Sequence, residues 1–236
     1  MRTLPFLWLS AGLLVSGCYI DDHDHYPPGN ERIEVIHETL PFDRIELETS
    51  SHIRLIQTDH YKVVITGWAE DVEDTHVQVA ENRLLIEEHG QIDPDQVIEI
   101  HVPSIRRLEL FGSSDVYGQT EFNQNGSIEL ASYGSGDIDM YLDADAVDAG
   151  IYGSGDIFLE GLTDNLDVFN SGSGWCRAFG LFSDFADVRV SGSGSVEVQV
   201  QHDLDVVISG SGNVFFKGHP FLHTQVSGSG RLIDAN

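Results

Sequence analysis

Cysteine and basic residues are scarce in this chain of 236 residues, which has two cysteines and 12 lysines and arginines against 39 aspartates and glutamates. Two cysteines without metal-site spacing exclude a disulfide framework and a cysteine-rich zinc module. The formal net charge of −27 repels phosphate backbones and anionic membrane surfaces, which excludes nucleic acid as a partner. Divalent cations are the counter-ions that such a chain would attract.

Catalytic motifs are missing as well. The chain has no Gly-x-Ser-x-Gly turn, no phosphate-binding loop followed by lysine and no His-Glu-x-x-His. A carbohydrate-active enzyme on a repeat scaffold would need carboxylate pairs with a basic residue nearby. The C-terminal part offers only Arg177, Arg189, Lys217 and Arg231, which are dispersed along the chain. We therefore interpret the protein as non-catalytic, with a carbohydrate-active enzyme and a purely structural envelope protein as alternatives.

The sequence has a single long apolar run, from Leu4 to Val15, and this run is too short to span a bilayer as a permanent helix. Residues 1–17 are predicted to be a lipoprotein signal peptide. The run ends in Val15-Ser16-Gly17-Cys18, which resembles the lipobox of bacterial lipoproteins. That resemblance implies that Cys18 carries the lipid and is the first residue of the mature protein, anchored to a membrane through its acyl chains.

Residues 18–30 are polar and acidic, and they are predicted to be a flexible tether. Acidic residues directly after a lipidated cysteine resemble the surface-export signal of Bacteroidetes lipoproteins. The implied location is the outer membrane, either exposed at the surface or facing the periplasm.

The most regular feature is the tripeptide Gly-Ser-Gly, with a degenerate Gly-Ser-Ser copy at Gly112. Full copies begin at Gly134, Gly153, Gly172, Gly192, Gly210 and Gly228, and the steps from Gly112 onward are 22, 19, 19, 20, 18 and 18 residues. A nearly constant period of this size is typical of a stacked repeat, in which each unit buries its apolar face against its neighbours.

Apolar residues alternate with polar ones on both sides of each tripeptide, which predicts strands with one buried face. Two residues after it stand Val116, Ile138, Ile157, Cys176, Val196, Val214 and Leu232, and six before its first glycine stand Ile128, Val147, Leu166, Ala186, Leu204 and Leu222. Each coil is thus predicted to run strand, glycine corner, strand, loop. Glycine suits the corner because it adopts positive φ and leaves room for the adjacent coils. The predicted fold is all-β, a β-solenoid of 18–22-residue coils.

Residues 31–110 alternate less regularly, and only Ala69 to Thr75 favour a helical turn. They are predicted to form irregular β coils or a cap, followed by the regular solenoid over 111–236. A separately folding subdomain that ends near Pro103 is the alternative.

The order of these features resembles the GIN domain family of auto-transporter adhesin heads. The resemblance rests on Phe42-Asp43-Arg44-Ile45, on Val102-Pro103 and on the serial Ser-Gly-Ser-Gly coils, and it covers about residues 35 to 234. It implies an extracytoplasmic β-solenoid lipoprotein and suggests an adhesin-like binding role. We interpret the ligand as a glycan or another surface ligand.

Candidate binding residues flank the tripeptides. Directly before the early copies stand Phe111, Tyr133 and Tyr152; directly after them stand Asp115, Asp137 and Asp156, followed in the next copy by Trp175. Stacking of coils predicts an aromatic ladder beside a carboxylate ladder. Such ladders could bind a sugar and Ca²⁺, while rung stabilisation by the aromatics and turn formation by the aspartates is the structural alternative. Cys176 occupies an inward position and is predicted to be an inert core residue.

Overall fold

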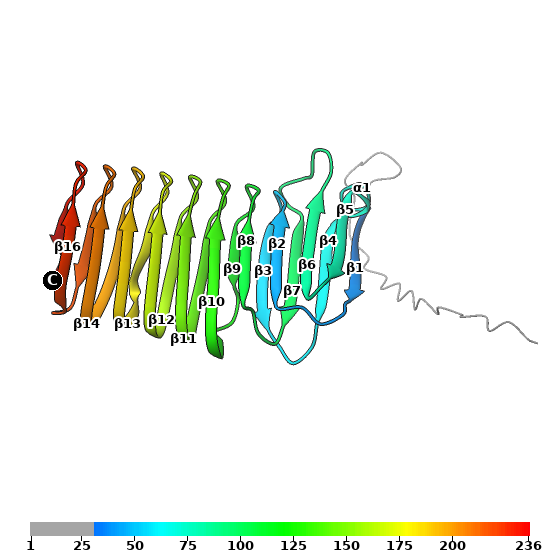
Figure 1. Cartoon of the computed structure of the whole chain (residues 1–236). Helices are drawn as coiled ribbons and strands as arrows, with labels where there is room; N and C mark the ends of the chain where they lie inside the picture. The colour runs from blue at the N-terminus through cyan, green and yellow to red at the C-terminus, as the bar shows by residue number, and fades with distance from the viewer. Residues whose placement is uncertain (1–30) are drawn as a thin grey trace, which may run out of the picture.

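The computed structural model describes residues 31–236, so the predicted signal peptide 1–17, the tether 18–30 and Cys18 lie outside the described residues. The described chain is a row of stacked coils that share one continuous 17-stranded sheet. Figure 1 shows the row from the side, with β1 near one end and β16 at the other. The predicted β-solenoid is therefore confirmed.

The elements of the N-terminal half are short. They are β1 (Arg32–Glu38), β2 (Arg44–Glu48), β3 (His52–Gln57), β4 (Lys62–Trp68), α1 (Ala69–Glu73), β5 (Thr75–Ala80), β6 (Arg83–Glu88), β7 (Val97–Val102), β8 (Arg107–Leu110) and β9 (Val116–Gly118). Those of the C-terminal half are β10 (Phe122–Ser132), β11 (Ile138–Ile151), β12 (Ile157–Asn170), β13 (Cys176–Val190), β14 (Val196–Ile208), β15 (Val214–Lys217), β16 (Phe221–Val226) and β17 (Leu232–Asp234).

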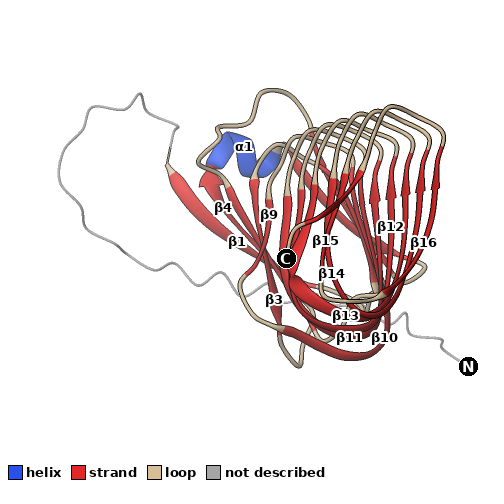
Figure 2. Cartoon of the chain, turned by 90° about the vertical axis from the view of Figure 1, so that its left-hand side faces the viewer, coloured by secondary structure: helices blue, strands red, loops and turns tan. Residues whose placement is uncertain are grey.

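Each coil has two walls that meet at the Gly-Ser-Gly corner (Figure 2). We call the wall that leads into the corner the entry wall and the wall that leaves it the exit wall. The long strands β11 to β14 begin in the exit wall, bend at the base and end in the entry wall, in parallel register from Ile138 against Ile157 to Ile151 against Asn170. The predicted loop between the two strands of each coil is therefore wrong for these coils, because ladder hydrogen bonds continue around the bend.

The corners themselves stack at backbone contact. A Cβ added to Gly153 would lie 1.9 Å from the carbonyl oxygen of Gly134, and one added to Gly134 would lie 1.9 Å from that of Gly112. The corner glycines are absent from the residues with positive φ. Glycine is therefore required here for close approach of coils, as predicted, and the prediction of positive φ is wrong.

The N-terminal coils stack out of chain order. On the entry wall β2 lies between β6 and β8, and on the exit wall β3 lies between β7 and β9. Beyond them β5 pairs antiparallel with β6, and β4 pairs antiparallel with both β7 and β1. One hydrophobic core runs through both halves of the described chain.

The inward columns predicted from the repeat are buried in the inner coils, and Cys176 is completely buried. Two polar residues interrupt an inward column and are bonded locally: Ser132 donates to the carbonyl of Gly136, and Asn170 donates to the carbonyl of Gly174. In the last coil Leu222 and Val226 occupy inward positions in register with β14, but they are about half exposed because no further coil covers them. Within residues 31–236 no helix is long and apolar enough to cross a membrane.

Candidate binding surface

The predicted aromatic ladder exists on the outer face of the entry wall. The rings of Phe111 and Tyr133 stack with centroids 4.7 Å apart and planes within 3°, and those of Tyr133 and Tyr152 stack at 4.6 Å and 9°. Phe169 extends the ladder at 5.6 Å with a tilted ring. Partial burial, with Tyr152, Glu109 and other charges nearby, raises the pKa of Tyr133, so the phenol stays neutral.

Stacking also limits what this ladder offers to a ligand. The ring of Tyr133 has one face against Phe111 and the other against Tyr152, and Tyr152 also meets the tilted ring of Phe169, so few ring faces remain open. The ring of Tyr152 also lies against Gly150, where a Cβ would come within 2.8 Å of it. A sugar packs its apolar face on an open aromatic face. The ladder therefore supports the stacking of coils more directly than it supports glycan binding.

The predicted carboxylate ladder lies at the start of the exit wall, across the corner from the aromatic rings. Oδ1 of Asp115 accepts the backbone N–H of Asp137 at 3.0 Å, and Oδ1 of Asp137 accepts that of Asp156 at 2.7 Å. Ser195 and Asn213 accept from the next coil in the same way in the later copies. This column is thus a ladder of side-chain acceptors for strand-initiating N–H groups.

Trp175 continues the aspartate column, since its backbone N–H donates to Oδ1 of Asp156 at 2.7 Å. Its ring stacks on Phe215 at 6.0 Å, and the guanidinium of Arg177 lies 4.8 Å from the Trp175 ring while pairing with Asp156 at 3.2 Å. The structure therefore separates Trp175 from the other three aromatic candidates. Residues 31–236 contain no group of three or more metal-ligating side chains, and calcium binding at the aspartates stays a prediction.

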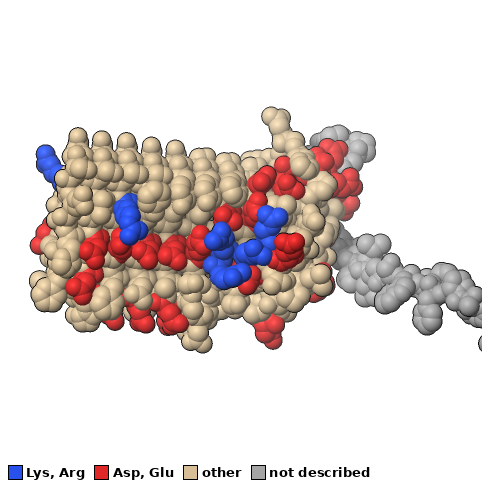
Figure 3. Space-filling view, in the orientation of Figure 1, with Lys and Arg blue, Asp and Glu red and all other residues tan. Residues whose placement is uncertain are grey.

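A second carboxylate row, which was not predicted from the sequence, lies on the entry wall. It runs along the entry wall in register, beside the aromatic ladder, and comprises Glu129, Asp148, Asp167, Asp187 and Asp205. Figure 3 shows acidic residues aligned along this face, with a basic group beside them over the early coils. Glu129 pairs with Arg107 at 2.6 Å, and Asp187 pairs with Arg189 at 2.7 Å.

The row is electrostatically strained. Burial, with Asp167 and Glu129 on either side, raises the pKa of Asp148. Burial also raises the pKa of Asp187 against the opposing effect of Arg189. The signal in the sequence is an acidic residue five positions before the first glycine of each tripeptide from Gly134 to Gly210. A shallow depression of about 410 Å³ lies between this row and the ladder, over Ala131 and Gly150.

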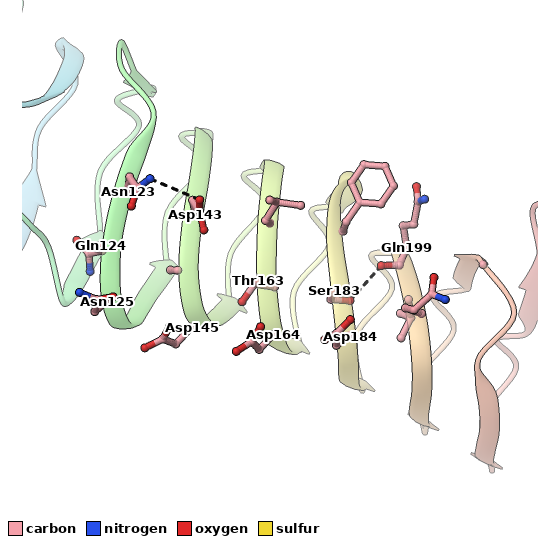
Figure 4. Close-up of a pocket in the computed structure, with 16 residues that line it drawn as sticks. Asn123, Gln124, Asn125, Asp143, Asp145, Thr163, Asp164, Ser183, Asp184 and Gln199 are labelled. Atoms are coloured by element: carbon pink, nitrogen blue, oxygen red, sulfur yellow. Dashed lines mark hydrogen bonds between the residues drawn. The ribbon is translucent and has the colours of Figure 1, made fainter.

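A concave surface, a groove of about 440 Å³, lies at the base of the coils, where the long strands bend. Figure 4 shows the groove crossing successive coils along the solenoid axis. Two exposed apolar side chains, Leu162 and Phe182, line it, each 54% exposed. The other side chains that line it are mostly amides, hydroxyls and carboxylates, among them Asn123, Gln124, Asn125, Asp143, Asp145, Thr163, Asp164, Ser183, Asp184, Gln199 and Gln201.

Several of these polar groups are held in place. Asp145 accepts the N–H of Gly126 at 2.8 Å, Ser183 donates to the carbonyl of Gln199 at 3.0 Å, and the amide of Asn123 lies 3.5 Å from Asp143. No lysine or arginine lines the groove. This surface was not predicted, because its residues stand in the segment predicted to be a loop, where no register between coils is expected.

The chain is similar to proteins of known family and fold. The family model described as "putative auto-transporter adhesin, head GIN domain" matches residues 41–220. A search of curated protein sequences gives no match.

Solved structures share the fold. A "putative adhesin" from Bacteroides fragilis superposes with a TM-score of 0.82 at 21% identity, covering 86% of this chain and 97% of that one. A "putative adhesin" from Parabacteroides merdae gives 0.71 at 14% identity, covering 87% and 97%. A "putative lipid binding protein" from Parabacteroides distasonis gives 0.64 at 20% identity, covering 89% and 98%. At these identities the likeness concerns the fold.

Proposed function

Because the chain belongs to the GIN domain family of auto-transporter adhesin heads, we propose that it is a non-catalytic, adhesin-like binding protein of the cell envelope. The names of its structural neighbours support an adhesin-like role. The surface supports it too, since the groove at the base of the coils holds carboxylates and no lysine or arginine among its lining residues.

Attachment through a lipid on Cys18 fits the shape of the molecule. The first described residues lie at one end of the row of coils and β16 lies at the other (Figure 1). A tether that enters at the β1 end would hold the solenoid away from the outer membrane and present its walls and far end to partners. Anchoring by two or more acyl chains is stable, whereas a single chain is not.

The ligand class that the groove fits best is an extended neutral or amino-bearing glycan. The observation that carries this proposal is Phe182, whose ring is exposed in the groove between amide and carboxylate side chains. A sugar ring could lie on Phe182 while Asp164 and Gln201, on the two adjacent strands, bond its hydroxyls, which is the usual composition of a sugar site. Asn123 lies three strands from Phe182, so it would bond a different sugar unit of an extended glycan. The carboxylates disfavour sulfated or uronic acid chains by like-charge repulsion.

A glycan array probed with residues 31–236 tests the proposal. We expect binding to neutral or amino-bearing glycans, a loss of binding in Phe182→Ala, and retained binding in Tyr152→Ala, whose ring is similarly exposed but belongs to the ladder. Retained binding in Phe182→Ala would place the site elsewhere. Absence of any glycan binding would favour the purely structural alternative.

Enzymatic activity and lipid binding need separate experiments. Release of new reducing ends from a bound glycan would support the alternative of a carbohydrate-active enzyme. The name of one structural neighbour makes lipid a second candidate, tested by sedimentation with neutral phospholipid vesicles. We expect no sedimentation, because the interior of the described solenoid is filled by its own buried side chains.

A further inference from the structure

The C-terminal end of the solenoid is an open edge. The strand β16 pairs with β14, and β17 pairs with β15, so their other edges have no neighbour among residues 31–236. Phe221, Leu222 and Val226 on β16 are 77%, 45% and 48% exposed. Unpaired backbone groups next to exposed apolar side chains are a template for strand addition.

The opposite end of the solenoid is protected against the same kind of pairing. Of the four exposed residues of the outer strand β1, three are charged, Arg32, Glu34 and Glu38, and one is apolar, Ile36. Charged side chains on an edge strand are a common device that prevents association. The strand β16 has no lysine, arginine or carboxylate.

The distribution of charge along the chain favours a second copy of this protein as the partner at the C-terminal end. After Asp205 the chain carries one carboxylate side chain, Asp234, together with Lys217 and Arg231, although the whole chain has a net charge of −27. Contact between the acidic walls of two copies is opposed by repulsion. The C-terminal end is the part of the surface where a second copy can approach without that repulsion.

We propose that two copies of this chain join tip to tip through antiparallel pairing of β16 with β16 of the second copy. The inward residues of this strand are Leu222, Thr224 and Val226, in register with buried residues of β14. Directly opposite residues of antiparallel strands point to the same face. A two-fold axis at Thr224 therefore keeps inward residues opposite inward residues and sets Leu222 against Val226 of the second copy.

Tip-to-tip pairing has a consequence for attachment. The N-terminal ends of the two solenoids point in opposite directions, since β1 and β16 lie at opposite ends of each molecule. The dimer would therefore link two surfaces that both display the protein, as a homophilic contact. This inference is independent of the glycan groove.

A cysteine placed on the two-fold axis tests the pairing in residues 31–236. Opposite residues in antiparallel strands have Cα atoms about 4.5–5.5 Å apart, within disulfide range, so Thr224→Cys should form a disulfide-linked dimer on mild oxidation. The matched control is Ser154→Cys, at an exposed corner of an inner coil. Native Cys176 is inert because burial raises the pKa of its thiol to about 12. Equal dimer formation by the two variants would overturn the proposal.

A charge at the axis tests the same contact without covalent chemistry. By sedimentation equilibrium we expect the unmodified 31–236 chain to show twice its monomer mass, and Thr224→Lys to be monomeric because two lysines would face each other. Leu162→Lys, on an exposed groove residue, should remain a dimer. Beads that carry the chain by its N-terminal end should cluster, and Thr224→Lys beads should not.

Three results would overturn the proposal. They are a monomer at all concentrations, a mass that grows beyond the dimer as head-to-tail stacking predicts, and loss of the dimer in Leu162→Lys. Retained glycan binding by Thr224→Lys separates this contact from the proposed function.

Discussion

Val206→Asp tests the assignment of inward and outward faces on which the fold rests. Val206 lies in the entry-wall part of β14, in register between Val188 and Thr224, and is 1% exposed. The neighbouring Asp205 is exposed and belongs to the outer carboxylate row. The two positions are adjacent in the chain but face opposite sides of the sheet.

The expected loss of stability is large. Removing a buried valine forfeits about 1.5–3 kcal/mol of apolar burial. The new carboxyl has no basic partner among the buried residues of 31–236 and must bind a proton to remain buried. At pH 7, protonating an aspartate of ordinary pKa, about 3.9, costs about 4 kcal/mol. The sum, about 6 kcal/mol, is comparable with the whole stability of a typical domain, about 5–15 kcal/mol.

Urea denaturation of residues 31–236, followed by circular dichroism, measures the effect. Val206→Ala isolates the loss of packing, and Asp205→Ser should change stability by less than about 0.5 kcal/mol. Because the folded state raises the pKa of the new carboxyl, the penalty in Val206→Asp should shrink by about 1.4 kcal/mol per pH unit on acidification. Equal midpoints for Val206→Asp and Asp205→Ser would show that the two faces are misassigned.

Three further predictions concern the anchor and the carboxylates. Cys18→Ser should abolish metabolic labelling with palmitate and release the protein from the membrane fraction; a variant that still labels and pellets would contradict lipidation. Calorimetric titration with calcium should show binding to the wild type that is lost in Asp137→Asn/Asp156→Asn, and no heat with the wild type would contradict the calcium site. Asp148→Asn/Asp187→Asn should melt at a higher temperature than the wild type at pH 7, because the folded state raises the pKa of both carboxyls and ionising them costs stability. That advantage should shrink as the pH falls through these raised pKa values, and an advantage independent of pH would show that the row is not strained.

The candidate site was predictable where it depended on the repeat. Residues at the same offset from the tripeptide stack because the coils are in parallel register, so the ladder of Phe111, Tyr133 and Tyr152 follows from sequence spacing. Sequence spacing does not show whether the faces of these rings are open to a ligand, because that depends on how the rings are oriented. The role of Asp137 as an acceptor for the N–H of Asp156 likewise depends on a rotamer that spacing cannot supply.

The groove was not predictable for a different reason. Its residues, including Leu162 and Phe182, stand in the segment predicted to be a loop, where the alternation of apolar and polar residues is interrupted. Such a segment can form either a loop or a strand that continues around the bend. Hydrogen bonds to the coils on either side decide between the two, and the sequence of one repeat does not show those bonds. Exposed apolar side chains at the bend are therefore visible only once the coils are stacked.

The sequence by itself determined the stacked coils, their inward faces and the glycine corners, because a period of 18–22 residues and an alternation of two residues act locally in every copy. Only the tertiary structure decided that β2 and β3 lie between later strands, since this order depends on contacts between segments 38 to 65 residues apart. It also decided which end of the solenoid is open. Every inner coil has two neighbours and the last has one, so the same column of residues is buried at Val206 and exposed at Thr224.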